Sequence, residues 1–163
     1  GPTLDEFLEL CKHPDVEVMN IEIKPSLEDD MTIVAKTIEA VKAHGLFDKL
    51  LISSFSAKML LESKKIDKSC RTAFLYSPKD KIVLKILFTS AKFAKSLGLY
   101  ALHPHYSLVT ASYVKKAHSR GIKVIPWTIN KDKDMRRMIK YGVDGIITDY
   151  PGVANQIIAE MNA

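Results

Sequence analysis

The sequence is poor in the features that mark several classes of protein. Its two cysteines, Cys11 and Cys70, form neither a CxxC pair nor a metal-ligand spacing, so neither a zinc site nor a disulfide framework is indicated. The longest apolar run, Ile82–Phe88, is interrupted by Lys85 and is far too short to span a bilayer. No signal peptide opens the chain. We therefore expect a cytoplasmic protein without a membrane span.

Charge is present in excess, but it is not arranged as in a nucleic-acid-binding protein. The net charge of +5 would tolerate an anionic ligand, yet the lysines are scattered, and no basic stripe is interleaved with aromatic residues. We therefore expect no nucleic-acid partner. The 163 residues, of which 47% are hydrophobic and 26% charged, suit one domain over residues 1–163 with a sizeable core.

Polar and apolar side chains alternate along the stretch Val18–Lys24. In a strand, Asn20, Glu22 and Lys24 lie on one face, and three apolar side chains lie on the other. The charged face could lie in water on the outside of the protein. It could also point into the mouth of a barrel, where a carboxylate and an ammonium group are costly unless they have a function. This stretch alone leaves both interpretations open.

The rest of the chain repeats one order: the end of a helix, a glycine, a strand and a polar tip. The glycines stand where a helix C-cap requires a positive φ, at Gly45, Gly98, Gly121 and Gly142. Repeated strand and helix units of this kind predict a parallel sheet with helices outside it.

We expect six strands, near Val16–Lys24, Leu50–Ser53, Arg71–Tyr76, Tyr100–His103, Ile122–Trp127 and Gly145–Thr148. A first helix starts at Thr3, with Glu6 completing a capping box, and a second stops near Gly45. Further helices are expected over Ala57–Lys65, about Lys81–Ser96, Ser107–Arg120, Asp132–Tyr141 and Val153–Met161.

Polar residues gather at the carboxyl ends of these strands, as they do at the site of a (β/α) barrel. They are Glu22 and Lys24, Ser53 and Ser54, Tyr76 and Ser77, His103 and His105, Trp127 and Asn130, and Thr148 and Asp149. We therefore expect an α/β fold of the TIM-barrel type. The alternative is an open doubly wound sheet, which usually has a glycine-rich phosphate loop after its first strand. Pro25-Ser-Leu-Glu28 is not such a loop.

Several segments, in this order, resemble the glycerophosphodiester phosphodiesterases. They are Pro2-Thr-Leu-Asp-Glu6, Asn20-Ile-Glu-Ile-Lys24, Ile52-Ser-Ser-Phe55, Leu102-His-Pro104, Gly121 through Trp127-Thr-Ile-Asn130, and Tyr141-Gly-Val-Asp-Gly-Ile-Ile-Thr-Asp149-Tyr-Pro151. The resemblance implies a TIM barrel that hydrolyses glycerophosphodiesters to glycerol phosphate and an alcohol, with a divalent metal, Mg²⁺ or Ca²⁺. It also implies roles for four residues. Glu22 resembles a metal-binding glutamate, Lys24 a phosphate-contacting lysine, and Phe55 and Trp127 apolar walls of the substrate cleft.

Two histidines are candidates for acid–base chemistry. His103 and His105 flank Pro104, so an extended backbone places both on one face. The resemblance also places His103 on the rim of the cleft. The alternative for each is a rim histidine bonded to a neighbouring backbone carbonyl.

The chain also departs from the family pattern. The family opens with a His-Arg-Gly strand, a Glu-x-Asp metal pair and a His-Asp step, all before the Pro-Thr-Leu segment at which this chain begins. By resemblance, we expect six of the eight βα units of a barrel, without the first two strands. We expect negligible hydrolysis by this chain alone. The other hypothesis is a catalytically silent remnant that binds anions or serves in assembly.

A barrel without two consecutive strands has unpaired edges, which cost free energy when they are buried. We therefore expect the gap to be covered. The gap could be covered by a second copy in a homodimer, by a complementing N-terminal segment, or by the chain's own first helix, Thr3–Cys11, folded across the opening. We favour the second copy, because both edges exist on every copy.

Overall fold

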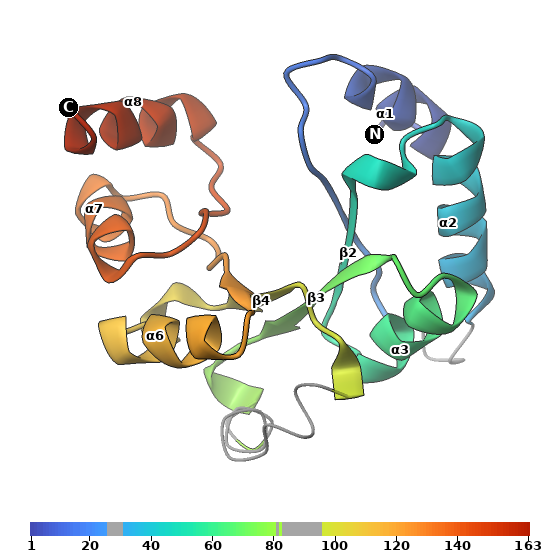
Figure 1. Ribbon diagram of the computed structural model, residues 1–163. Helices are drawn as coiled ribbons and strands as arrows, with labels where there is room; N and C mark the ends of the chain where they lie inside the picture. The colour runs from blue at the N-terminus through green and yellow to red at the C-terminus, as the bar shows by residue number, and fades with distance from the viewer. Residues whose placement is uncertain (26–30, 81, 83–95) are drawn as a thin grey trace. The chain divides into compact units, whose positions relative to one another are not determined.

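Parallel strands and helices alternate along the chain in the computed structural model (Figure 1). The structure describes residues 1–25, 31–80, 82 and 96–163. The chain divides into two compact units, Gly1–Phe74 and Leu75–Ala163.

The first unit contains three parallel strands in the order β1, β2, β3. Its elements are α1 (Leu4–Cys11), β1 (Met19–Glu22), α2 (Thr32–Ala43), a 3₁₀ turn over Phe47–Lys49, β2 (Leu50–Ser54), α3 (Ala57–Ile66) and β3 (Arg71–Tyr76), whose last two residues belong to the second unit. In the register of the strands, Glu22 lies opposite Ser53, and Ser53 lies opposite Ala73. These three residues therefore share one face of the sheet.

The core of the first unit forms because β2 is buried along its whole length and the helices bury one stripe each. In α2, Val34, Ile38 and Val41 are buried as the helical period predicts, whereas Ile33 is 45% exposed. The same holds for α1, where Leu8 and Cys11 are buried. Of the four apolar residues at helical spacing in α1, the other two, Leu4 and Phe7, are 40% and 36% exposed. In both helices, the buried face is thus narrower than the stripe of apolar residues at helical spacing in the sequence.

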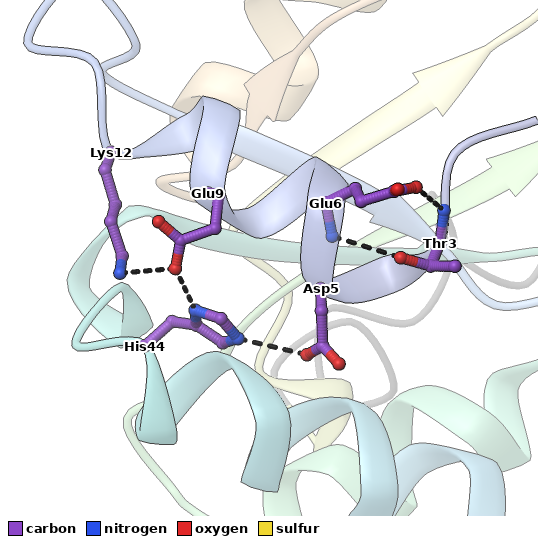
Figure 2. Close-up of polar contacts among 6 residues, drawn as sticks. All are labelled: Thr3, Asp5, Glu6, Glu9, Lys12 and His44. Atoms are coloured by element: carbon purple, nitrogen blue, oxygen red, sulfur yellow. Dashed lines mark hydrogen bonds and ion pairs between the residues drawn. The ribbon is translucent and has the colours of Figure 1, made fainter.

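Local hydrogen bonds fix the start of α1 (Figure 2). The Glu6 N–H donates to Thr3 Oγ1 at 3.2 Å, and the Thr3 N–H donates to Glu6 Oε2 at 2.7 Å. This confirms the capping box that the sequence predicts. Farther along the helix, the ring of His44, which follows α2, lies between the carboxylates of Asp5 and Glu9. A tertiary contact therefore holds α1 to the end of α2.

The second unit contains the remaining strands, β4 and β5, which are parallel to each other. Its elements after β3 are a 3₁₀ turn over Pro78–Asp80, β4 (Ala101–Pro104), a 3₁₀ turn over Tyr106–Leu108, α6 (Ala111–Ser119), β5 (Lys123–Val124), α7 (Asp132–Tyr141) and α8 (Pro151–Met161). The helix expected over about Lys81–Ser96 lies almost wholly outside the described residues. Helix α7 has the predicted bounds. Helix α6 starts at Ala111 rather than Ser107, because the Thr110 hydroxyl caps it by accepting the Tyr113 N–H.

The predicted sixth strand, Gly145–Thr148, is not a strand in the structure, and β5 is only two residues long. The segment lies beside the chain that follows β5 and makes isolated backbone bonds. Just before it, the Asp144 N–H donates to Val124 O; within it, the Ile147 N–H donates to Pro126 O and Ile147 O accepts the Ile129 N–H, all at 2.9 Å. Pro126 has no N–H to donate in return. A continuous ladder therefore does not form there. The α/β class with parallel strands and surrounding helices is confirmed, with five strands in the described residues.

The four predicted C-cap glycines have φ values of 57–85°. Gly142 illustrates the reason for the positive φ. It ends α7 in the left-handed conformation, in which its N–H donates to Ile139 O at 3.0 Å.

Across the described ranges, no helix combines the length and the apolar character needed to cross a bilayer. The expected cellular location stays a prediction.

Candidate functional site

Glu22 and Lys24 stand on either side of a buried residue at the end of β1. Both are exposed, and Ile23 between them is 3% exposed. The backbone of Ile23 is fixed by two bonds: its N–H donates to Ser53 O at 2.8 Å, and its carbonyl accepts the Ser54 hydroxyl at 2.7 Å. The extended backbone therefore continues beyond β1 and presents Glu22 and Lys24 on the same side, as the alternation predicts.

The carboxyl end of β2 adds a buried hydroxyl and an exposed ring to this part of the first unit. Ser53 lies beside Glu22 in the register, is fully buried, and its Oγ has no hydrogen-bond partner among the described residues. Phe55 follows β2 and is 42% exposed. The structure thus places the predicted Glu22 at the end of β1, Lys24 just beyond it, and Phe55 after the neighbouring β2, all in one compact unit.

His103 lies on β4 and is 1% exposed, with no hydrogen bond of good geometry at either ring nitrogen within the described part of the chain. Burial lowers the pKa of His103 to about 4, and the nearby backbone of Leu102 and Ile125 opposes this effect only in part. The imidazole is therefore neutral near pH 7 and holds no proton that it could give as an imidazolium.

His105 follows β4 and is half-buried. Its Nδ1 accepts the Ser107 N–H at 3.3 Å and lies 2.7 Å from the Ser107 hydroxyl. A backbone N–H can only donate, so Nδ1 carries no proton, and Nε2 is the protonated nitrogen of the neutral ring. Among the described residues, the partner of His105 Nδ1 is thus a turn residue.

Trp127 connects the loop after β5 to both histidines. Its Nε1–H donates to the backbone carbonyl of His103 at 2.8 Å. The His105 ring meets the indole edge-on, with centroids 5.1 Å apart and an angle of 86° between the planes. The indole is half-buried, which fits a ring that is packed on one side and open on the other.

A polar cluster joins the last two loops at the carboxyl ends of the second unit. Asn130 Nδ2 donates to Asp149 Oδ2 at 2.8 Å, and Asn130 Oδ1 accepts the Asp149 N–H at 3.0 Å and the Thr148 hydroxyl at 3.2 Å. The sequence placed all three residues at strand tips but did not predict that Asn130 joins the two loops. The available signal was an asparagine after one strand and an aspartate after the next.

Asp144 serves the opposite end of the second unit. Its Oδ2 accepts the Val124 N–H at 2.8 Å at β5 and lies 2.7 Å from Nε2 of His118. These contacts agree with the structural role, rather than a catalytic one, that its position in the turn before the last strand-like segment suggests.

The residues that the structure describes do not form a complete metal site. No group of three or more His, Cys, Asp or Glu side chains in residues 1–25, 31–80, 82 and 96–163 is placed to hold an ion. Glu22 alone offers a carboxylate on its strand face, whereas Mg²⁺ and Ca²⁺ take about six or more oxygen ligands.

Comparison with known proteins identifies the family. The model of the glycerophosphoryl diester phosphodiesterase family matches residues 2–153, and the chain belongs to this family. A glycerophosphodiester phosphodiesterase of Caldanaerobacter subterraneus is 36% identical over 150 residues, covering 92% of this chain and 58% of its own. One of Bacillus altitudinis is 29% identical over 162 residues, covering 98% and 63%.

Solved structures agree. A Silicibacter pomeroyi structure described under the same enzyme name is 29% identical with a TM-score of 0.88, over 99% of this chain and 57% of that one. An Oleispira antarctica phosphodiesterase, solved with the product sn-glycerol-3-phosphate, is 26% identical with a TM-score of 0.82, over 97% and 61%. The chain thus spans about three fifths of the length of the relatives it matches.

Proposed function

We propose that this chain contributes to a site that hydrolyses glycerophosphodiesters to glycerol phosphate and an alcohol. The observation that carries the proposal is the family match over residues 2–153. Support for the substrate class comes from the related Oleispira antarctica phosphodiesterase, which was solved with sn-glycerol-3-phosphate.

Lys24 is the proposed phosphate-binding residue. Lys24 is exposed just beyond the end of β1, and it forms no ion pair with a carboxylate of the described residues. An ammonium group there can neutralise a phosphoryl oxygen. Glu22, on the same face, is proposed to supply one carboxylate to a divalent cation, Mg²⁺ or Ca²⁺. The described residues do not complete such a site, so its other ligands belong to groups outside them.

Phe55 and Trp127 are proposed as apolar walls for the substrate. Each presents a partly exposed ring at the carboxyl end of a strand. Trp127 is held in a fixed orientation by its bond to His103 O, so its face needs little ordering when a ligand binds.

The two histidine candidates differ in their fitness for acid–base chemistry. His103 is buried and its lowered pKa keeps the ring neutral, so we propose that it supports Trp127 through its carbonyl. His105 is half-buried and presents Nε2 with its proton because Ser107 occupies Nδ1. Its Nε2–H can donate a hydrogen bond to a leaving oxygen, so we propose His105 as the better of the two candidates. Full transfer of a proton requires the imidazolium, in which Nδ1 no longer accepts the Ser107 N–H.

A second candidate function is that of a catalytically silent module that binds anions or takes part in assembly. The observation in its favour is the lack of a three-ligand metal group within the described ranges. In such a module, Lys24 would bind an anion and no hydrolysis would follow.

Binding and turnover separate the two functions. Isothermal titration calorimetry should detect sn-glycerol 3-phosphate binding to the chain in preference to inorganic phosphate, and Lys24→Gln should weaken it by about tenfold, as expected for the loss of a charged contact. Lys65→Gln, at an exposed lysine on α3, is the matched control. Equal affinity for both anions would favour the silent module.

Turnover is followed by ³¹P NMR with glycerophosphocholine and Mg²⁺ or Ca²⁺. We expect negligible hydrolysis by the chain alone. Metal-dependent release of glycerol phosphate that is lost in Glu22→Gln would contradict this expectation and assign catalysis to the residues present, His105 first.

A partner is also proposed for the edge of the sheet. In the described part of the first unit, β1 pairs with β2 on one side only. Its other edge offers backbone groups to a further strand, which a second copy of the chain can supply. Light scattering at micromolar concentration should then give the mass of a dimer, and a monomer would leave the complementing segment as the remaining proposal.

A further inference from the structure

Backbone pairing between the last two loops of the second unit stops before the loops end. The Ile147 N–H donates to Pro126 O and the Ile129 N–H donates to Ile147 O, both at 2.9 Å. Beyond Ile129 the next link comes from a side chain. The Asp149 N–H donates to Asn130 Oδ1, so this amide oxygen takes the place that a backbone carbonyl has in a ladder.

The orientation of the Asn130 amide is set by its partners. A backbone N–H can only donate, so the atom that faces the Asp149 N–H is the oxygen, and the NH₂ group faces the Asp149 carboxylate at 2.8 Å. The Thr148 hydroxyl gives the same oxygen a second bond, and Thr148 Oγ1 accepts the Tyr150 N–H at 3.0 Å. Three hydrogen bonds of one side chain thus connect the two loops.

The loop that Asn130 closes also carries Trp127. At its near end the loop is bonded to β4: the Trp127 N–H donates to Pro104 O at 3.0 Å, and Trp127 O accepts the Tyr106 N–H at 2.9 Å. At its far end the side-chain bonds are those of Asn130. Trp127 therefore lies between its own backbone bonds to Pro104 and Tyr106 on one side and, on the other, the backbone bond from Ile129 to Ile147 followed by the side-chain bonds of Asn130.

We propose that Asn130 is a positioning residue for Trp127 and Asp149, and that it fixes the apolar wall of the site together with a carboxylate at the rim. This inference rests on the proposed function for the claim that Trp127 contacts a substrate. The positioning of Trp127 by Asn130 can itself be measured without a substrate. Asn130 acts through Trp127 and Asp149 and needs no contact with the reacting phosphate.

The exchange of the two side chains gives a sharp test. In Asn130→Asp a carboxylate replaces the NH₂ group opposite Asp149, so two like charges face each other at the former 2.8 Å contact. Adding Asp149→Asn restores the hydrogen bond in the reverse direction: the amide at position 149 donates to the carboxylate at position 130. The other oxygen of that carboxylate still accepts the backbone N–H of residue 149. Asn155→Ala, at an exposed position of α8, is the control in the same unit.

Trp127 is the single tryptophan of the sequence, so its fluorescence reports on this loop alone. Asn130→Asp should shift the emission to longer wavelength and increase quenching by acrylamide. It should also weaken binding of sn-glycerol 3-phosphate by about fivefold, which corresponds to ~1 kcal/mol. The double variant should return all three readouts toward those of the parent, and Asn155→Ala should leave them unchanged. Circular dichroism confirms that each variant is folded.

The proposal is overturned if Asn130→Asp leaves emission and quenching as in the parent, or if the double variant fails to restore them. Restored fluorescence in a protein whose parent form does not bind sn-glycerol 3-phosphate supports the positioning role and counts against the proposed function instead.

Discussion

The indole N–H of Trp127 donates a 2.8 Å hydrogen bond to the backbone carbonyl of His103. This bond crosses from the loop after β5 to β4, and it couples the proposed wall of the site to a strand that is buried along its length. The orientation of the ring therefore depends on the backbone of the neighbouring βα unit.

Trp127→Phe should lower the free energy of unfolding by about 1 kcal/mol, because the His103 carbonyl loses its donor while most of the ring area remains. Urea unfolding followed by circular dichroism measures this loss. Tyr150→Phe removes a hydroxyl from a residue that is 55% exposed and should change stability by less than about 0.5 kcal/mol. Equal stabilities of Trp127→Phe and the parent would show that the bond contributes nothing.

The buried imidazole of His103 should make stability depend on pH. Its pKa of about 4 in the folded state lies below the value of about 6.5 in the unfolded state, so the unfolded chain binds the proton more readily. The contribution to stability is fully present above about pH 6.5 and is lost as pH falls toward 4, by up to about 3 kcal/mol.

The measurement is urea unfolding between pH 7 and 4 for the parent and for His103→Leu, which lacks the titrating group. The difference between the two proteins isolates His103 from the carboxylates, among them Asp67, whose pKa is lowered mainly by its bond with Lys42. A difference that stays constant over this range would contradict the prediction.

Gly142→Ala should destabilise the protein by about 1 kcal/mol because a side chain is strained at a φ of +85°. Space is not the reason, since the nearest atom to an added Cβ would be 4.0 Å away, on Val114. Gly152→Ala is the control. Gly152 lies in the first turn of α8 with open space around it, so alanine there should stabilise by up to about 1 kcal/mol. Thermal unfolding of both variants should move Tm in opposite directions.

His44 is expected to hold α1 in place. Its Nδ1 lies 3.1 Å from Glu9 Oε1 and its Nε2 lies 3.0 Å from Asp5 Oδ1, as Figure 2 shows. His44→Ala should accelerate hydrogen exchange at the amides of Leu8 and Cys11, which fold against the core. His13→Ala removes a more exposed ring, whose Nδ1 accepts the Asp15 N–H at 3.2 Å and lies 3.7 Å from the Asp15 carboxylate, and it should not change these rates. Unchanged exchange in His44→Ala would show that apolar packing alone holds the helix.

The sequence by itself determined the features that depend on neighbouring residues. The capping box of Thr3 and Glu6 and the bounds of α7 arise from groups three to ten residues apart. The placement of Glu22 and Lys24 on one face follows from the period of a strand. The family was also recognisable, because its segments occur in order along the chain.

Only the tertiary structure decided what depends on distant residues. Pro126 prevents a ladder with the segment 145–148, although that segment has the composition of a strand. His103 looks as available as His105 in the sequence, but burial lowers its pKa to about 4. Asn130 and Asp149 are 19 residues apart, and no local pattern predicts their bond. Burial and pairing between residues so far apart in the sequence arise only when the chain packs, so no local pattern of residues predicts them.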